Sequence, residues 1–365
     1  MSDTQIVELD EPEPAAAPRP WRAGSLTLFA VPVLLAAAAT LTLTARTETR
    51  PTLAESPAPT TAPRPAATLQ LIAIITLPPS TPSVALTESG NPEVLGDRRW
   101  SSPGPAYPAR GDVAEAVLRG DIYLIGGTGT TEDGRNVFRY DTMTGSRQRA
   151  PDLPISLDHA MAATLGDRIY VFGGFVFAQA SARVFSLGAN DTSWTEEALM
   201  PQGRAAGGAV ALDGRVWLVG GVALNGSWIP EVWSWDGAGR WSTGLALMPT
   251  PRDHLAVGTY RGSICAAGGN GGPQAFECYE PAHNEWTKLR DLRKPVLAGR
   301  ASEAGGWFWV VERDVHAFNG DTWNFAPRLQ SPRAGGALVT IADVLYFVEG
   351  ATGRPASMEV LKLQR

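Results

Sequence analysis

A short apolar stretch followed by two glycines recurs at a regular interval in this chain. Four clear copies end in the pairs Gly126 and Gly127, Gly173 and Gly174, Gly220 and Gly221, and Gly268 and Gly269. The first glycines of successive pairs lie 47, 47 and 48 residues apart. Weaker copies without a clean pair follow at 307–311 and 344–350. Such a period predicts stacked supersecondary units, with each apolar stretch forming a buried strand.

Two further strand signatures accompany each apolar stretch. A third strand of mostly apolar and aromatic residues begins at six positions: Val137, Val184, Val232, Phe276, Val315 and Val360. A fourth strand carries a tryptophan in four units: Trp194, Trp241, Trp286 and Trp323. The first unit has Arg147 in that place, and the sixth ends at Arg365 before any such strand. Trp100 lies 47 residues before Arg147, so we expect 98–102 to supply the outer strand of the last unit and to leave no open edge there.

Six units in register, with their glycine pairs, aromatic residues and tryptophans, resemble the Kelch-repeat family. The resemblance covers residues 97–365 and implies an all-β, six-bladed propeller in which every blade is a four-stranded antiparallel sheet. We expect Tyr123, Tyr170 and Trp217 to fill the space between blades, because burial of large side chains is the main stabilising term. The glycine pairs would supply backbone turns with positive φ.

The first 96 residues differ in composition from the repeats. Residues 1–23 are acidic and rich in Pro and Ala, which predicts a disordered tail. Residues 24–45 carry no charge over 22 positions, a span of about 33 Å as a helix, which predicts one transmembrane signal anchor. Residues 46–96 read as a Pro/Thr/Ala-rich stalk. Within it, the apolar segment 69–77 is either an extra strand on the propeller or part of the stalk.

The charges that flank the apolar helix do not decide its orientation. Arg19 and Arg22 precede it, and Arg46 and Arg50 follow it. A short tail before the helix and a spacer after it favour a single-pass protein with an extracytoplasmic propeller. A cleaved signal peptide, giving a secreted protein, is the alternative. The acidic N-terminus and the bulky Leu43 near the candidate cleavage site argue against it.

Composition excludes several function classes. The chain has 31 basic and 37 acidic residues, a formal net charge of -6, which argues against a nucleic-acid partner. With two cysteines and four histidines we expect no disulfide scaffold, no metal centre and no cofactor.

Two sets of side chains are candidates for binding near the central channel. Arginines recur near the start of the first strand: Arg110, Arg204, Arg252, Arg300 and Arg333. The resemblance implies that this strand lines the channel, where the arginines would bind an anion or a sugar acid. The alternative is that each one bonds carbonyls or carboxylates of its own ring. His159 and His254 each follow an aspartate at matching places, but no third metal ligand is evident.

The loops and the two cysteines add further candidates. Phe175, Phe177 and Trp228 lie in loops that follow glycine pairs, where exposed aromatic residues would anchor a partner; packing between loops is the alternative. Cys265 and Cys278 are equidistant from the centre of one hairpin. They would either face each other as a disulfide or remain two buried thiols.

These observations leave two hypotheses for function. The first is a membrane-tethered, non-catalytic propeller that binds protein partners or ligands on the extracytoplasmic side. The second is a carbohydrate-active enzyme in the channel, either similar to sugar-acid mutarotases or similar to copper oxidases, although the Tyr–Cys and histidine set of the oxidases cannot be assembled here. A pocket with convergent Arg, His and a carboxylate of perturbed pKa would favour the enzyme.

Overall fold

The computed structural model describes residues 98–129, 134–351 and 355–363. The tail, transmembrane helix and stalk expected over 1–96 lie outside these residues and stay predictions. Within the described ranges no helix is long and apolar enough to cross a membrane. Every helix or strand assigned there is a β-strand.

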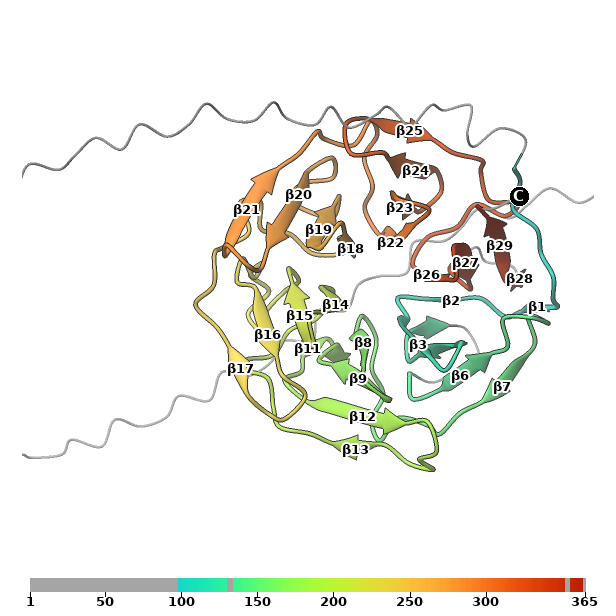
Figure 1. The fold of residues 1–365 in the computed structure, drawn as a ribbon. Helices are drawn as coiled ribbons and strands as arrows, with labels where there is room; N and C mark the ends of the chain where they lie inside the picture. The colour runs from blue at the N-terminus through green and yellow to red at the C-terminus, as the bar shows by residue number, and fades with distance from the viewer. Residues whose placement is uncertain (1–97, 130–133, 352–354, 364–365) are drawn as a thin grey trace, which may run out of the picture. The chain divides into compact units, whose positions relative to one another are not determined.

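Six antiparallel sheets stand side by side around a central axis and form a six-bladed propeller (Figure 1). The first three blades run from the channel outward as β3 (Ala114–Leu118), β4 (Asp121–Ile125), β6 (Val137–Tyr140) and β7 (Arg147–Arg149); β8 (Met161–Leu165), β9 (Arg168–Phe172), β12 (Val184–Gly188) and β13 (Thr195–Glu196); and β14 (Gly208–Leu212), β15 (Arg215–Val219), β16 (Trp233–Trp235) and β17 (Trp241–Ser242).

The last three blades follow the same order. They comprise β18 (Ala256–Tyr260), β19 (Ser263–Ala267), β20 (Phe276–Glu280) and β21 (Glu285–Lys288); β22 (Arg300–Ala304), β23 (Trp307–Val311), β24 (Val315–Phe318) and β25 (Trp323–Phe325); and β26 (Ala337–Ile341), β27 (Val344–Val348) and β29 (Glu359–Lys362). Short ladders pair β1 (Ala106–Tyr107) with β28 (Ala356–Ser357), β2 (Arg110–Gly111) with β5 (Thr128–Gly129), and β10 (Phe175–Val176) with β11 (Gln179–Ala180).

The sixth blade is completed by residues that precede the first blade. Ser101 donates its N–H to the carbonyl of Val360 at 2.9 Å and accepts the Val360 N–H at 2.8 Å. Trp100 beside it is buried. The predicted closure by 98–102 is therefore confirmed, and the ring has no open edge at this seam.

The apolar residues pack between neighbouring blades. Tyr123, Tyr170 and Trp217 are buried, as expected. One cluster joins Ile125 of the first blade to Phe185 of the second, and equivalent clusters follow around the ring. Stability therefore comes mainly from contacts between successive sheets.

The glycine pairs hold adjacent blades together. Gly126 and Gly127 have φ of 65° and 88°, and the later pairs repeat these left-handed values. A side chain on Gly127 would lie 2.6 Å from the carbonyl oxygen of Gly111. The second glycine of a pair donates its N–H to a carbonyl of the next blade, as Gly127 does to Leu157 at 2.9 Å and Gly221 to Arg252 at 2.9 Å. Only glycine combines this φ with so close an approach.

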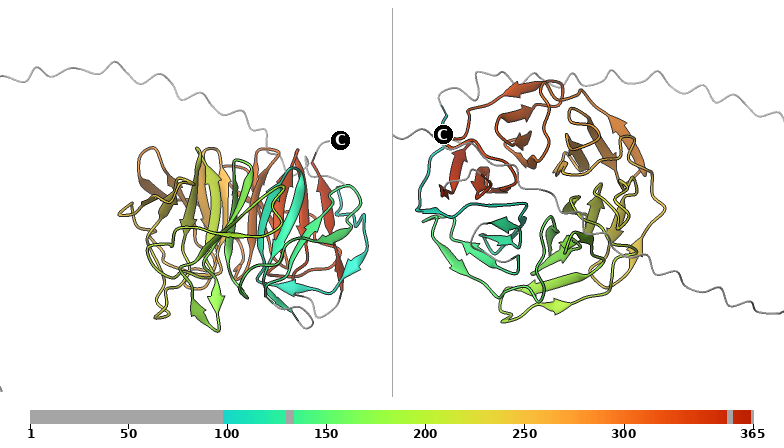
Figure 2. Two further views of the ribbon diagram at one scale, coloured as in Figure 1. Left: turned by 90° about the horizontal axis from the view of Figure 1, so that it is seen from below. Right: turned by 180° about the vertical axis from the view of Figure 1, so that it is seen from behind.

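Connections lie at the two ends of the strands (Figure 2). In each complete blade, the loop between the second and third strands and the link to the next blade emerge at one end, called the loop face from here on. The turns between the first and second strands and between the third and fourth strands lie at the opposite end, because adjacent strands are antiparallel. Met143, in the turn between β6 and β7, belongs to that opposite face.

Candidate functional site

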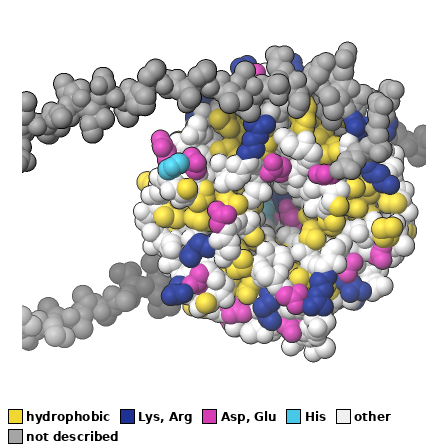
Figure 3. Space-filling model, in the orientation of Figure 1, with side chains coloured by type: hydrophobic (Ala, Val, Ile, Leu, Met, Phe, Trp, Pro, Cys, Tyr) yellow, Lys and Arg dark blue, Asp and Glu magenta, His cyan; other side chains and the backbone are white. Residues whose placement is uncertain are grey.

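The six inner strands surround a cavity of about 430 Å³. Most of its wall consists of Ala, Val, Gly and Thr, with Glu115 and Glu303 as its charged lining residues. Figure 3 shows the hollow at the centre of the ring, with acidic and histidine side chains visible inside it.

Four of the five predicted channel arginines lie inside the protein instead. Arg110, Arg204, Arg252 and Arg333 are each at most 1% exposed, so the expectation that they line the channel is wrong. They precede the inner strands by four residues, and their side chains run into the blades rather than toward the axis.

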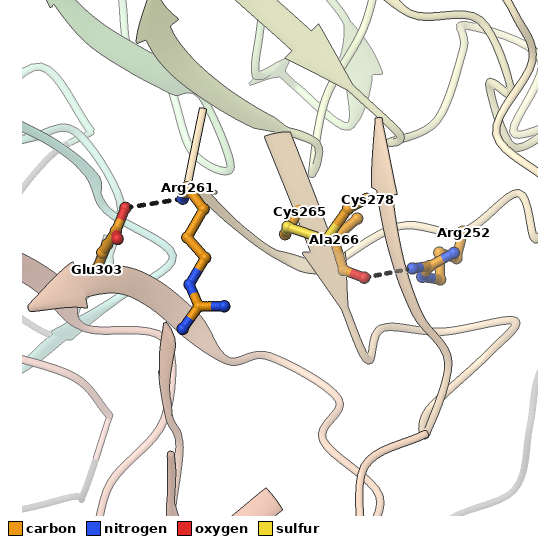
Figure 4. Close-up of a disulfide and its surroundings, with 6 residues drawn as sticks. All are labelled: Arg252, Arg261, Cys265, Ala266, Cys278 and Glu303. Atoms are coloured by element: carbon orange, nitrogen blue, oxygen red, sulfur yellow. Dashed lines mark hydrogen bonds between the residues drawn. A yellow bond between two sulfur atoms is a disulfide. The ribbon is translucent and has the colours of Figure 1, made fainter. Parts of the chain in front are cut away.

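Arg252 shows what these arginines do. Its Nε donates to the carbonyl of Gly268 at 2.7 Å, its Nη2 to that of Ala266 at 2.8 Å (Figure 4), and its Nη1 to Glu277 at 2.6 Å. Arg333 forms the same kind of pair with Glu359, and Arg110 pairs with Glu349 at 2.9 Å. Burial lowers the pKa of Arg252, and Glu277 opposes that shift. These arginines therefore bind carboxylates and carbonyls of the propeller itself, which is a structural role.

Arg204 lacks such a carboxylate. Trp233 occupies the place that Glu277 has in the fourth blade, and its ring lies 3.8 Å from the guanidinium carbon. The Arg204 Nη2 donates to the carbonyl of Glu231 at 2.9 Å. Burial lowers the pKa of Arg204 to about 9. In the second blade, Leu157 stands at the position of Arg252 and Phe185 at the position of Glu277. Both charged residues of the pair are thus replaced by apolar ones.

Of the five predicted arginines, Arg300 is the one that contacts a side chain lining the channel. It is the first residue of β22, and its Nε lies 3.4 Å from Oε2 of Glu115 in β3. The pair reaches past the sixth blade, whose inner strand begins at the small Ala337, directly after Gly336. Burial raises the pKa of Glu115 and Arg300 lowers it, with a net upward shift. The residue equivalent to Arg252 in this blade is Val296, whose carbonyl accepts the N–H of Gly269.

The two histidines meet at the mouth of the channel on the loop face. Their rings lie 4.9 Å apart edge to face, and each Nδ1 is 2.6 Å from the preceding aspartate, Asp158 or Asp253. Both backbones are left-handed, with φ of 52°. The backbone N–H of His159 donates to the carbonyl of Asp112. The backbone N–H of Ala206 donates to the carbonyl of His159, and that of His254 donates to the carbonyl of Ala206. Among the described residues, no group of three or more His, Cys, Asp or Glu is arranged to hold a metal ion.

Five residues form what we call the rim: Asp112, Asp158, His159, Asp253 and His254. Its carboxylates have only uncharged or histidine partners among the described residues. Asp112 lies 3.5 Å from Nε2 of His159, and Asp253 accepts from Asn270 at 2.7 Å and from Trp228 at 3.0 Å. Burial raises the pKa of Asp253, but the hydrogen bonds from His254, Asn270 and Trp228 together lower it by more, so the net shift is downward.

The predicted aromatic anchors border the rim. Phe175 is half-buried, with its ring 5.4 Å from His159. Phe177 is 97% exposed at the tip of the β10–β11 hairpin, where both Phe177 and Ala178 have left-handed φ. Trp228 is 46% exposed. Packing between loops therefore accounts for Phe175 and part of Trp228, and not for Phe177.

A second cavity, of about 550 Å³, opens beside Trp228 and is called the Trp228 cavity. Apolar and polar residues of the second and third blades line it, among them Gln202, Leu224, Trp228, Ile229, Pro230 and Glu231. Leu224 is largely exposed. Trp228 connects the cavity to the rim, because it lines the cavity and its Nε1 donates to Asp253.

Comparison with known proteins agrees with this architecture. A family model described as Kelch motif matches residues 109–154, which span the first blade. Kelch-like protein terF of Aspergillus terreus is 28% identical over 185 residues, covering 46% of this chain and 40% of the relative. Mouse Kelch-like protein 35 is 29% identical over 165 residues, covering 43% and 27%. Beta-scruin of Limulus polyphemus is 26% identical over 237 residues, covering 58% and 26%. The chain spans less than half the length of these relatives.

A solved structure shares the fold. The structure of YjhT superposes with a TM-score of 0.63 at 17% identity, covering 71% of this chain and 97% of that one. The chain is a six-bladed β-propeller with a Kelch motif in its first blade, and it is called the Kelch propeller from here on. At such low identity the likeness supports the fold, and the chemistry of the Kelch propeller has to be argued from its own residues.

The two cysteines of the Kelch propeller are bonded to each other. Cys265 of β19 and Cys278 of β20 are direct partners across the hairpin, with Cα atoms 4.0 Å apart and a disulfide between the sulfur atoms (Figure 4). Both are buried in the fourth blade. The bond links two adjacent strands within the core of one blade and is not part of the rim or the channel.

Sequence reasoning missed Asp112, Glu115 and Leu224. The repeat could have found Asp112, since the positions two residues after Arg110, Leu157 and Arg252 are Asp112, His159 and His254. It could also have excluded Arg300 from the arginine series, because counting back 16 residues from the first glycine of each pair gives Arg110, Leu157, Arg204 and Arg252. The Glu115–Arg300 contact joins blades that are not neighbours, and no local pattern signals it.

Proposed function

We propose that this Kelch propeller is a non-catalytic protein-interaction module that binds its partner on the loop face, around the rim and the Trp228 cavity. The observation that carries the proposal is the position of Trp228. Its indole is half-exposed, lines a cavity and is held by Asp253, so a large aromatic surface is presented on a rigid scaffold. Rigid aromatic residues of this kind dominate the binding energy of protein interfaces.

The hairpin tip supports the same face. Phe177 and Ala178 hold left-handed backbone conformations that cost non-glycine residues of order 1 kcal/mol or more each. Almost the whole of the Phe177 side chain faces solvent. The exposed Phe177 ring contributes no burial to the stability of the fold, although its turn is conformationally unfavourable. A partner that covers the ring would offset the conformational cost of the turn.

A carbohydrate-active enzyme in the channel is the second candidate, and one observation favours it. Glu115, whose pKa is raised, lies in the channel beside Arg300. Against it, the two groups neutralise each other and most of the remaining wall is Ala, Val, Gly and Thr. A thermal shift of the full-length chain with sugar acids, lost in Arg300→Gln, would favour the enzyme.

We further propose that the propeller is tethered to a membrane on its extracytoplasmic side. The 22 uncharged residues at 24–45 support tethering. The disulfide between Cys265 and Cys278 supports an oxidising compartment. Protease protection of the full-length chain in sealed membrane vesicles tests this, because a cytoplasmic propeller and an extracytoplasmic one are cut from opposite sides.

Photo-crosslinking tests the interaction face. A photoreactive amino acid replaces Leu224 on the loop face or, as a control, Met143 on the opposite face, which is even more exposed. We expect a discrete crosslinked partner from the position of Leu224 and none from that of Met143. Equal crosslinking from both positions, or none from Leu224, contradicts the proposal.

A further inference from the structure

We infer that the loop face takes a basic partner segment, which places an apolar side chain in the Trp228 cavity and a Lys or Arg against the rim. The inference rests on the proposed function and specifies the chemistry of the partner. Three observations carry it: the cavity, the charge of the rim and the residue that joins them.

The cavity suits a large apolar side chain. At about 550 Å³ it falls within the size range of ordinary ligand pockets. Leu224, Trp228, Ile229 and Pro230 give it apolar walls. Leu224 and Trp228 are both exposed, so a side chain that enters removes their surface from water together with its own.

The charge of the rim selects a cation. Asp112, Asp158 and Asp253 supply three carboxylates around the paired imidazoles. In 98–129, 134–351 and 355–363, no Lys or Arg forms an ion pair with any of them. Uncompensated carboxylates around a recessed mouth attract a guanidinium or ammonium group and repel an acidic segment.

Trp228 places the two features within reach of one segment. It lines the cavity and donates to Asp253 of the rim. Its ring also offers a face on which a cation is favourable. On the other side, Phe175 packs with Ala180, Ala205 and Val222, so the β10–β11 hairpin abuts the loop that bears Trp228. A single extended peptide therefore meets an aromatic residue, an apolar cavity and carboxylates in succession.

Selection from a random linear peptide library displayed on phage, with the full-length chain in lipid nanodiscs as bait, tests the inference. We expect the enriched peptides to share a large apolar residue close to a Lys or Arg. Binding of a synthetic peptide of that pattern should fall about 30-fold in Trp228→Ala. It should fall about fivefold in the Asp112→Asn/Asp158→Asn double variant, and it should weaken with added salt.

Asp213→Asn is the control for loss of one carboxylate. Asp213 is exposed, lies in the turn between β14 and β15 on the opposite face, and has φ of 52°, which Asn accommodates well. The thermal unfolding midpoint of each variant confirms that it is folded.

The outcomes separate the inference from the proposed function. Enriched peptides that are acidic or uncharged, yet lose binding in Trp228→Ala, overturn the basic-segment inference and leave the loop face as an interaction site. No enrichment, or binding equally insensitive to Trp228→Ala and Asp213→Asn, overturns the inference outright. The crosslinking from position 224 decides the proposed function independently.

Discussion

The indole Nε1 of Trp100 donates a hydrogen bond to the carbonyl oxygen of Pro327 at 2.8 Å. Four other blades repeat this bond from outer strand to preceding blade, at 2.8 to 3.0 Å: Trp194 to Pro151, Trp241 to Leu199, Trp286 to Ala246, and Trp323 to Arg290. Trp100 precedes the first blade in the chain, whereas Pro327 lies near the C-terminus. The contact that closes the ring is therefore the same indole-to-carbonyl bond that joins the blades within it.

The first blade, which has no such tryptophan, is secured differently. Arg147 lies over the rings of Tyr107 and Phe138 and contacts Glu349 of the sixth blade at 3.2 Å. Tyr140 donates to the same carboxylate at 2.7 Å. Burial raises the pKa of Tyr140. A buried polar network thus replaces the indole bond where the chain closes on itself.

Trp100→Ala should destabilise the propeller as strongly as loss of an internal tryptophan. We expect a loss of about 3–5 kcal/mol in the free energy of unfolding, from the cavity left in the sixth blade. Trp100→Phe keeps most of the packing and should lose about 1–2 kcal/mol with the hydrogen bond. Urea unfolding of the full-length chain measures both. A negligible effect of Trp100→Ala would mean that 98–102 does not close the ring.

The buried pair of Arg252 and Glu277 predicts a compensating double variant. Arg252→Leu alone leaves a buried carboxylate without its cation and should cost about 3–5 kcal/mol. Arg252→Leu/Glu277→Phe recreates the pair Leu157 and Phe185 of the second blade. We expect it to unfold at a higher urea concentration than either single variant. A double variant whose loss equals the sum of the single losses would show that the two side chains are not coupled.

These pairs show how much of the protein could be predicted from its sequence. The blade count, the closure by Trp100 and the burial of Tyr123 followed from the 47-residue period, because a repeat fixes which positions meet. The sequence could not predict that the Arg252 side chain points into the blade, because an arginine pointing into the channel would recur at the same spacing. Its carboxylate partner lies 25 residues away on another strand and differs between blades, so only the packed structure identifies it.

The channel pair gives a pH dependence. The folded-state pKa of Glu115 lies above its ordinary value of 4.5, so the folded protein binds this proton more tightly than the unfolded chain does. Ionised Glu115 therefore opposes folding at pH above its folded pKa, and the penalty fades as pH falls toward 4.5. Arg300→Gln removes the group that limits the penalty. We expect its loss of stability to be larger at about pH 7 than at about pH 4. An equal loss at both would exclude this electrostatic role.

The disulfide makes a simple chemical prediction. Protein isolated from its native source without reductant should show no free thiol before reduction and two after it, by mass spectrometry of alkylated peptides. Cys265→Ala/Cys278→Ala should lower the free energy of unfolding by about 3 kcal/mol, given the short loop that the bond closes. Reduced wild-type protein is the matched control and should approach the double variant. Two alkylated thiols in unreduced protein would contradict both the bond and the oxidising compartment.

The affinity of the full-length chain for its crosslinked partner tests the account most directly. Trp228→Ala and Phe177→Ala remove the aromatic side chains of the loop face, and Met143→Ala removes an equally apolar, exposed side chain of the opposite face. We expect each loop-face variant to raise the Kd about 30-fold with little change in stability, and Met143→Ala to leave the Kd unchanged. Wild-type affinity in both loop-face variants, or a loss in Met143→Ala alone, would contradict the claim that this propeller binds through its loop face.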